Sequence, residues 1–469
     1  MRRRNATLEQ RLVSPGSRRH QTTLAVVLVL AASGCATVDP SGDYERARSL
    51  VHDATGEATL FSPDEEEKAR EAVDALLAGG LTSTEAAQVA LLNNQDLQAL
   101  LFDIGIGHAD VVQAGLLSNP SLQALVRLPL DGGSANSEGG LLLNLADLWR
   151  VPARKRVAQS KLEQTVLSVA HRAAALAADA RKSYLSAVAA TQSRFVAAEN
   201  LETARQFYAL SQERLEAGGA TQVDVNAAHS RFLEQRVREV AARFEETQAR
   251  LQLLTTLGLQ GSLKDLELNE ALLAPQELGL DVDTLLAGAS KHRLDLQSAA
   301  KEVEAAERSI PLERRRRWRA VGGGVAFEAQ GGELALGPAV NIALPIFDQN
   351  QAQIAKAELR YGQTLRRLEG LNARINQQVH VAHAKYEVAE ETVRLYEREL
   401  LPLREQSLEL ARESFTAGKT GFLYVLEAQN ELLIARSEYI EHLRQLASTI
   451  PALEAACGSP LTELIDSRD

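Results

Sequence analysis

The stretch VHVAHAKYEVAEETVRLYEREL, residues 379–400, decides the fold of this chain. Its apolar and aromatic positions are separated alternately by three and four residues, a pattern that predicts helices supercoiled side by side. These positions are Val379, Ala382, Tyr386, Ala389, Val393, Tyr396 and Leu400. Residues 233–254 and 422–450 keep the same alternation, so the sequence predicts several coiled-coil helices.

The sequence around this stretch is one half of an internal duplication. Asp96-Leu97-Gln98 recurs as Asp295-Leu296-Gln297, and Ala217-Gly218 recurs as Ala417-Gly418, about 200 residues later in each case. A period of this length is too long for a solenoid unit and indicates duplication of a whole half. We expect a first repeat over 83–260 and a second over 283–450. The remaining segments are an acidic linker with one short helix (35–82), a connector (261–282) and a C-terminal segment (451–469).

Both repeats have the same predicted order of elements. A helical segment (83–115 and 283–310) is followed by a glycine-interrupted region, and a very long helix comes next (153–217 and 350–417). A glycine-marked turn near 218–221 or 418–421 then leads to a returning helix (222–257 and 422–449), which proline or glycine ends at Gly258 or Pro451. Helices of about 65 residues reach roughly 100 Å. A plain coiled-coil rod would have the same helical periodicity.

The glycine-interrupted regions predict β-strands, which a rod lacks. Apolar residues alternate with small or polar ones over about 120–130, 140–148, 319–330 and 337–347. Each strand has the length that crosses a bilayer when tilted, about 9–11 residues. Four strands cannot close a barrel, and an open sheet edge in lipid leaves backbone groups unpaired. We therefore expect the chain to oligomerise, with three copies supplying twelve strands.

Two tryptophans stand where the predicted strands meet helices. Trp149 and Trp318 are the only tryptophans in the chain, and Arg316 and Arg317 lie beside the second. Tryptophan at such a boundary is typical of a membrane interface, and clustered arginine suits anionic lipid head groups. The alternative for the arginines is an ordinary solvated basic patch.

Composition excludes several classes of protein. The chain has 51 basic and 62 acidic residues, a net charge of −11, which argues against a general nucleic-acid binder. Its two cysteines cannot form a disulfide framework. The longest apolar stretch, 24–32, is too short for a membrane-spanning helix. Aromatic residues make up only 4% of the chain, as expected for a thin helical wall with little interior.

Residues 1–34 have the features of a signal peptide. An arginine-rich start precedes a short apolar stretch, and small residues then precede Cys35. This arrangement resembles a bacterial lipobox, in which Cys35 becomes a lipidated N-terminus. The alternative is an ordinary cleavage site beside an incidental cysteine. Ala36, in place of Asp, resembles the signal for outer-membrane sorting. Without residues 1–34 the net charge is −16, from 45 basic and 61 acidic residues.

Taken together, these features resemble the TolC family of outer-membrane efflux factors. The residues that carry the resemblance occur in the same order in both halves, and it covers essentially the whole chain after the signal peptide. They are AAQVALLNNQDLQALL (86–101), QAGLLSNP (113–120), LPIFDQN (344–350), RLEAG (214–218), and SFTAG (414–418) with the sequence that follows as far as Gln429.

The resemblance implies a mainly α-helical protein with a membrane β part, which forms a homotrimer. The trimer would have a 12-stranded barrel in outer-membrane lipid and a helical tunnel through the periplasm of a Gram-negative bacterium. The tunnel would dock on a periplasmic adaptor and an inner-membrane pump of the RND or ABC type. The residues expected to contact the adaptor at the tips are Gly218, Gly219, Thr221, Gly418, Lys419 and Thr420.

The resemblance also points to a gate at the periplasmic end. The family usually places two acidic residues one helical turn apart inside the second tip, and here the matching positions are Tyr424 and Glu427. Asp224 occupies the equivalent position in the first half. A trimer would thus present one ring of three Glu427 carboxylates, which would repel one another and attract cations. This departure puts a family-wide salt-bridge lock in doubt.

The leading interpretation is a passive exit duct for small toxic compounds or metal ions. One alternative is the exit duct of a type I protein secretion system, and another is a lipid-anchored periplasmic coiled-coil scaffold without a pore. We expect no enzymatic activity, no cofactor and no nucleic-acid partner. His380 and His383 lie one helical turn apart, but two ligands do not make a metal site.

Overall fold

The computed structural model describes residues 37–128, 130, 132, 135–260, 267–270, 272, 279, 281–318, 320–330 and 332–466. The chain divides into two units, Met1–Asp39 and Pro40–Asp469, and the description below concerns the second. The predicted signal peptide and Cys35 lie outside the described residues, as does most of the predicted connector.

No helix in the described part of the chain is both long and apolar enough to cross a membrane.

Three short helices precede the first repeat. They are α2 (Ser41–Thr55), the 3-10 turn η1 (Pro63–Glu65) and α3 (Glu66–Ala78). The sequence predicted one short helix in this segment. Tyr44, Ala47, Val51 and Ala54 give α2 a buried face with steps of three and four residues, and α2 packs on α6. The periodic run covers only four apolar positions, too few to predict a helix within an acidic segment.

The two repeats contain matching elements. The first comprises α4 (Ser83–Asn93), α5 (Gln95–Gly115), β1 (Ser121–Arg127), β2 (Asn136–Asn144), α6 (Asp147–Glu216) and α7 (Gln222–Leu257). The second comprises α8 (Val282–His292), α9 (Leu294–Arg316), β3 (Val321–Gln330), β4 (Glu333–Ile342), α10 (Gln351–Leu395), the π-helical turn η3 (Tyr396–Leu400), α11 (Leu401–Thr416) and α12 (Phe422–Cys457). The short helix α13 (Leu461–Asp466) follows.

The four strands form one antiparallel sheet in the order β1-β2-β3-β4. Ser121 pairs with Leu142, Ser137 with Ala329, and Val321 with Ile342. The pairing of β2 with β3 joins the two repeats. Because the described part of the chain adds no strand outside them, β1 and β4 are the edges of this sheet.

Two strands end earlier than the sequence predicted. The strand expected at 140–148 is β2, which ends at Asn144 because α6 begins three residues later. The strand expected at 337–347 is β4, which covers 333–342. Pro345 lies beyond its end and has no N–H for a ladder.

Three helices, α6, α9 and α12, extend beyond their predicted bounds and contain a proline. Helix α6 begins at Asp147, before Pro152, rather than near 153. Helix α12 continues through Pro451 to Cys457, where the sequence predicted an end at Pro451. A proline inside a helix costs about 3 kcal/mol or more. In α12 this cost is offset by the burial of Leu453, Ala456 and Cys457, all beyond the proline.

The second long helix is interrupted, whereas the sequence predicted one continuous helix over 350–417. The π-helical turn η3 ends two residues before Pro402, at the start of α11. Proline cannot donate a backbone hydrogen bond and its ring clashes with the carbonyl four residues earlier, and a wider π turn accommodates both effects.

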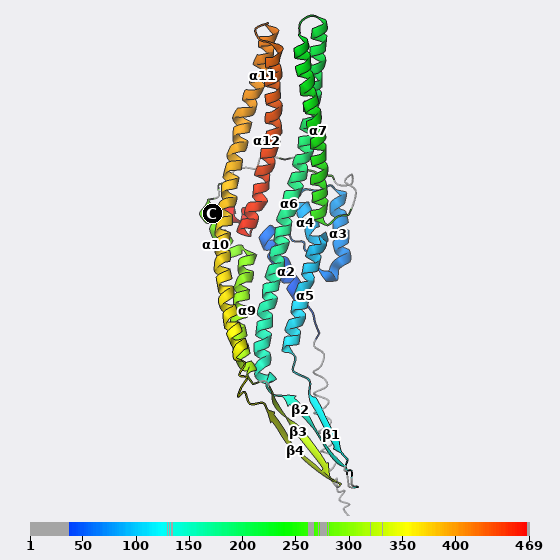
Figure 1. Ribbon diagram of the computed structural model, residues 1–469, viewed down its shortest axis with the longest axis vertical. Coiled ribbons are helices and arrows are strands. Elements are labelled where there is room, and N and C mark those ends of the chain that lie inside the picture. Colours follow the sequence, from blue (N-terminus) through cyan, green and yellow to red (C-terminus); the bar gives the residue numbers. More distant parts are fainter. Residues whose placement is uncertain are drawn as a thin grey trace, which may run out of the picture. The chain divides into compact units, whose positions relative to one another are not determined.

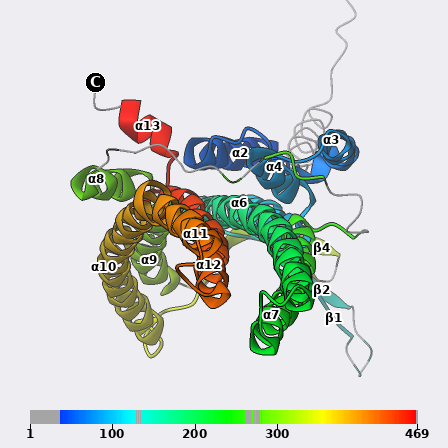
Figure 2. The same ribbon diagram turned by 90° about the horizontal axis from the view of Figure 1, so that it is seen from above.

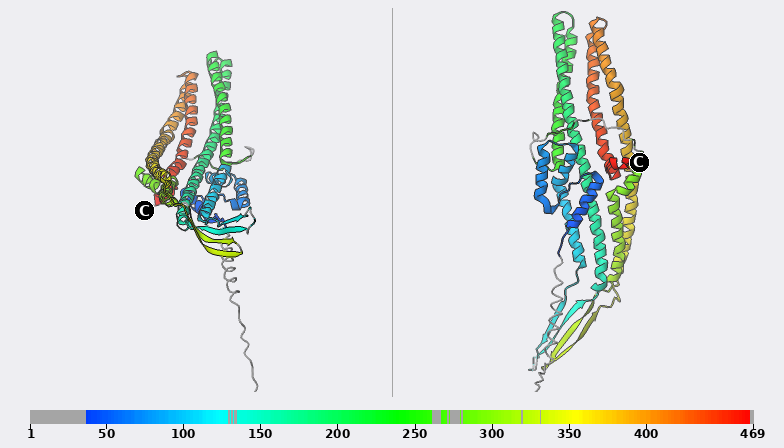
Figure 3. Two further views of the ribbon diagram at one scale, coloured as in Figure 1. Left: turned by 60° about the horizontal axis from the view of Figure 1, so that its bottom comes forward. Right: turned by 180° about the vertical axis from the view of Figure 1, so that it is seen from behind.

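Within unit Pro40–Asp469, the sheet lies at one end and the two helical hairpins at the other (Figure 1). Toward the hairpin end, α11, α12, α6 and α7 stand side by side, and α10 and α7 occupy the two ends of an arc when viewed along the long axis (Figure 2). Helices α2, α4 and α5 lie beside α6, and α3 packs on α4 (Figure 3). Helix α6 contacts most of the other helices, and its buried face is rich in alanine, which permits close approach.

The repeated Asp-Leu-Gln motif follows the short break between α4 and α5 in the first repeat and between α8 and α9 in the second. We call this break the joint of each repeat. In the first repeat, Asn93 Nδ2 donates to the carbonyl oxygen of Leu257 at 3.0 Å, and Asn94 Nδ2 donates to that of Thr256 at 3.0 Å. In the second, Arg293 Nη1 donates to the carbonyl oxygen of Ala455 at 3.1 Å. Each joint therefore supplies donors to the open C-terminal carbonyls of its repeat's last helix.

Candidate functional site at the hairpin tips and strand–helix junctions

The two hairpin tips have the same turn geometry. Gly218 and Gly418 adopt φ values of 72° and 70°, the left-handed region that ends a helix. Gly219 N donates to the carbonyl of Arg214 at 2.7 Å, and Lys419 N donates to that of Ser414 at 2.9 Å. A Cβ atom added at Gly218 or Gly418 would meet nothing within 4 Å. Backbone conformation, not space, therefore explains these glycines.

The tips differ in how the returning helix begins. At the first tip, Thr221 N donates to Asp224 Oδ2 at 2.8 Å, and Asp224 N donates to Thr221 Oγ1 at 3.3 Å, which is a capping box. At the second tip, Gly421 is the N-cap residue and provides no side-chain acceptor. The Thr420 hydroxyl is buried without a hydrogen-bond partner.

This difference separates the three residues that the sequence placed at the gate. The Asp224 carboxylate stabilises the first turn of α7, so it has a structural role. Tyr424 is 70% exposed at the matching position of α12. The Glu427 carboxylate lies 3.5 Å from Arg231 of α7, and that contact links the two hairpins. No hydrogen bond or ion pair of the described residues joins Asp224 to Tyr424 or Glu427.

An aromatic layer that the sequence did not predict also joins the hairpins below the tips. The ring of Phe422 lies 6.2 Å from that of Phe207 and 5.4 Å from that of Phe415. The Arg214 guanidinium of α6 lies 4.1 Å from the Phe415 ring centroid of α11, and that of Arg412 lies 5.8 Å from Phe207. These cation–π contacts cross from one hairpin to the other in both directions.

The strand–helix junctions are tied to each other by the predicted boundary residues. Arg150 donates to the carbonyl of Trp318, and Arg315 Nη1 donates to the carbonyl of Trp149 at 3.1 Å. Each repeat thus supplies an arginine that holds the tryptophan backbone of the other repeat. Trp149 and Trp318 are each 36% exposed.

Both predicted interface arginines are exposed, and one of them is paired. Arg316 binds Glu313 at 2.6 Å, and Arg317 is exposed. Arg319, which belongs to the same run, lies outside the described residues.

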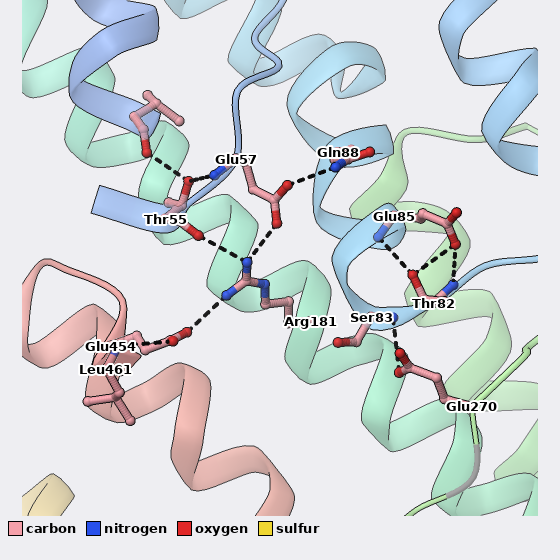
Figure 4. Close-up of polar contacts among 11 residues, drawn as sticks. Thr55, Glu57, Thr82, Ser83, Glu85, Gln88, Arg181, Glu270, Glu454 and Leu461 are labelled. Atoms are coloured by element: carbon pink, nitrogen blue, oxygen red, sulfur yellow. Dashed lines mark hydrogen bonds and ion pairs between the residues drawn. The ribbon is translucent and has the colours of Figure 1, made fainter. Parts of the chain in front are cut away.

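A buried polar cluster joins distant segments midway along the molecule (Figure 4). Arg181 of α6 binds Glu57 at 2.6 Å and Glu454 of α12 at 2.9 Å, and also donates to the carbonyl of Thr55 at 3.1 Å. Burial raises the pKa of the Glu454 carboxyl, although Arg181 opposes this shift. The partners are separated from Arg181 by more than 120 residues, so no local pattern could identify them.

Metal-ligand chemistry finds little support in the described residues. They contain no group of three or more His, Cys, Asp or Glu side chains placed to hold a metal ion. His383, one of the two helical histidines singled out above, lies 3.5 Å from Glu387 on the same helix.

With this geometry established, comparison with known proteins identifies the family. The model of the outer membrane efflux protein family matches residues 86–259 and 285–459, once in each repeat. No curated protein sequence matches the chain.

Solved structures share the fold at low sequence identity. The outer-membrane protein VceC of Vibrio cholerae is 17% identical, with a TM-score of 0.66, and the match covers 81% of this chain and 96% of that one. The open state of the MtrE outer-membrane channel of Neisseria gonorrhoeae is 19% identical, with a TM-score of 0.66 and coverage of 81% and 89%. The CmeC channel of Campylobacter jejuni is 16% identical, with a TM-score of 0.63 and coverage of 82% and 88%.

The class defined by this fold is a non-enzymatic outer-membrane channel with a helical tunnel. The chain belongs to the outer membrane efflux protein family, and the resemblance and fold class predicted from the sequence are confirmed. It is therefore an outer-membrane efflux channel of Gram-negative bacteria. Members of the family form trimers and work with adaptor proteins and inner-membrane pumps.

Proposed function

We propose that three copies of this chain form a passive exit duct for small toxic compounds or metal ions. The observation that carries this proposal is the four-stranded sheet, whose edge strands β1 and β4 pair with no further strand among the described residues. Such edges cannot remain unpaired in lipid, and three sheets joined edge to edge close into twelve strands. The helix-only scaffold considered from the sequence has no such sheet.

In this proposal one end of the duct lies in the outer membrane and the other end contacts the adaptor. The strand–helix junctions of the three copies lie at the membrane boundary. There the partly exposed Trp149 and Trp318 anchor the junctions, and Arg317 faces lipid head groups. The opposite ends, at Gly218, Gly219, Thr221, Gly418, Lys419 and Thr420, contact the adaptor. The adaptor in turn connects to an inner-membrane pump of the RND or ABC type. Lipidated Cys35 anchors the N-terminus in the outer membrane.

Conductance measurements test the duct directly. Protein purified in detergent should run as a trimer by light scattering and should produce discrete current steps in planar bilayers. Trimers that never produce current steps would contradict an open path through the assembly, whereas monomers would contradict the twelve-stranded closure.

Lipidation has a separate test. Mass spectrometry of the mature protein should find a diacylglycerol-modified N-terminus at Cys35, and Cys35→Ser should lose that mass while the chain still reaches the outer membrane through its strands. An unmodified cysteine in the native protein would contradict the anchor.

A further inference from the structure

Two helices form the outer edges of the helical row. Helix α12 contacts both α10–α11 and α6, and α6 contacts α7, so the order across the row is α10–α11, α12, α6, α7. In one copy, none of the described helices covers the outer faces of α11 and α7 at the two ends of this row (Figure 2). Copies placed side by side would bring one edge against the other, a head-to-tail contact of the kind that closes rings.

The α10–α11 edge carries a straight apolar stripe that includes one irregular step. Its exposed residues are Val381, Val388, Leu395, Leu403 and Leu410. The steps between them are seven, seven, eight and seven residues. The seam packed against the rest of the molecule, at 379, 386, 393, 401 and 408, has the same steps. Both faces therefore contain one extra residue at the same level.

The π-helical turn η3 (Tyr396–Leu400) lies at that level. In a regular α-helix a step of eight residues rotates the next side chain by about 80°, which would turn Leu403 and Leu410 off the stripe. A π turn holds more residues than an α turn and absorbs the extra one. The turn is fixed to α12, because Tyr396 Oη donates to Glu438 at 2.9 Å. Helix α6 has no such turn between Asp147 and Glu216.

The α7 edge carries a stripe with matching spacing. Val237, Phe244 and Leu251 are seven residues apart and are 70%, 67% and 49% exposed. Counted from Gln222 at the start of α7, these residues lie 15, 22 and 29 positions from the tip. Counted back from Thr416 at the end of α11, Leu403, Leu395 and Val388 lie 13, 21 and 28 positions from the tip. Both tips point the same way (Figure 1), so at 1.5 Å per residue the levels agree within about 3 Å.

The charges around the two stripes are complementary. Residues 225–251 of α7, the same levels as 387–413, contain five arginines and four glutamates, a net charge of +1. Residues 387–413 on the other edge contain eight glutamates and four arginines. The two edges of one chain thus carry opposite net charge at the same level, which favours contact with a second copy over self-repulsion.

We propose that the α10–α11 edge binds the α7 edge of a second copy of this chain, with Leu395 opposite Phe244, and that the π turn keeps this contact in register. The inference rests on the proposed trimer and specifies its helical interface. The extra residue is accommodated inside η3, so the stripe stays continuous above and below it.

Cysteine pairs test the register. We expect copper-catalysed disulfides between copies for Leu395→Cys with Phe244→Cys, and for Val388→Cys with Leu251→Cys, seen as linked species on a denaturing gel. Leu395→Cys with Val237→Cys is the matched negative control, because those levels differ by about 9 Å. Each single-cysteine variant should give no linked species. Efficient linking of the mismatched pair, or a trimer in which no matched pair links, would overturn the register; a monomeric parent would overturn the trimer itself.

Two single-residue deletions test the π turn. Both are made in a Pro402→Ala variant, so that the proline after the turn does not itself prevent a regular α-helix. Deletion of Glu399 removes the extra residue, restores seven-residue steps on both faces and should keep both matched disulfides. Glu391 is an equally exposed glutamate between Val388 and Leu395. Its deletion shortens the step between these two residues from seven to six, so the two side chains no longer lie on one stripe. It should reduce at least one matched disulfide tenfold or more. Equal yields from the two deletions would overturn the role of the turn.

Discussion

At the scale of single residues, Cys457 is the simplest test of the core. Its side chain is fully buried at the end of α12, and burial raises the pKa of its thiol to about 12. Because the thiolate is the reactive form, Cys457 should resist maleimide at pH 8 in the folded protein and react after denaturation. A Lys68→Cys thiol on α3, where the native side chain is 78% exposed, is labelled under the same conditions as the control. Rapid labelling of Cys457 in native trimers would contradict this burial.

Arg181 is a residue whose removal should destabilise the fold strongly. Arg181→Met leaves the buried carboxylates of Glu57 and Glu454 without their cation, which should destabilise the fold by about 3–5 kcal/mol. Arg205→Met, which removes an exposed partner 3.6 Å from Glu202, should cost less than about 1 kcal/mol. Thermal unfolding in detergent measures both. Equal midpoints for the two variants would contradict the burial of this cluster.

The same substitution should show a particular pH dependence. The pKa of Glu454 is raised above its ordinary 4.5 by burial, and Arg181 partly offsets the shift. Removing Arg181 raises that pKa further, and a carboxyl with a raised folded-state pKa destabilises the fold as pH rises through it. The loss of unfolding free energy in Arg181→Met, relative to the parent protein, should therefore be largest at neutral pH and become smaller on acidification. Midpoints at pH 7 and 5, each compared with the parent at that pH, check the sign.

The residues that the sequence could predict are those with local causes. Gly218 and Gly418 were predicted at the tips because a left-handed helix end favours glycine, and their φ values agree. Arg181 and Arg231 were not predicted, because their partners are brought near only by the packing of separate helices. Asp224 was assigned to the gate from its position alone, while its bond to Thr221 reveals a cap. A capping-box pattern was present in the sequence and would have identified it.

At the scale of elements, the first turns of α7 and α12 should differ in stability. Gly421 has φ −77° and ψ 159°, an extended conformation open to threonine, and an added Cβ would meet nothing within 4 Å. Gly421→Thr with Tyr424→Asp would copy the capping box of α7 into α12 and should stabilise its first turn by about 1 kcal/mol. Hydrogen exchange at residues 422–425 should slow about fivefold. Gly421→Ala with Tyr424→Asp, which lacks the hydroxyl acceptor, should not reproduce the slowing.

The end of α7 depends on glycine for two reasons. Gly258 has φ 70°, and an added Cβ would lie 2.7 Å from the carbonyl oxygen of Asn93 in the repeat joint. Gly218→Ala meets only the backbone cost, about 1 kcal/mol, because its surroundings are open. Gly258→Ala should therefore lower the unfolding midpoint clearly more than Gly218→Ala. Identical midpoints would contradict the close approach of the joint to α7.

Periodicity predicted the types of element better than their ends. Heptad spacing and period-two alternation identified the long helices and the strands, because each reflects which face is buried. The extension of α12 past Pro451 and the π turn before Pro402 depend on what packs beside the helix, and no local rule contains that information. The eight-residue step was nevertheless visible in the sequence, and following the stripe beyond Leu400 would have revealed it.

At the scale of the whole molecule, the duplication explains why the two ends can differ in rigidity. At the sheet end the repeats share backbone pairing between β2 and β3 and exchange arginine contacts at the tryptophan carbonyls. At the hairpin end they meet through aromatic side chains and through the partly exposed pair of Arg231 and Glu427. Such contacts separate at lower cost than a strand ladder, so movement of the hairpins is expected at the tips rather than at the sheet.

Glu427 connects that movement to ion passage. It is 57% exposed and its contact with Arg231 is long, so a proposed trimer would present three such carboxylates near the tips. Glu427→Gln removes their charge and should weaken block by divalent cations, raising the half-blocking Mg²⁺ concentration several-fold in planar bilayers. Glu413→Gln, an exposed change on α11, is the matched control and should leave the block unchanged. Equal block in the parent and Glu427→Gln would exclude this ring as the cation site, while equal effects of both substitutions would assign the block to general surface charge.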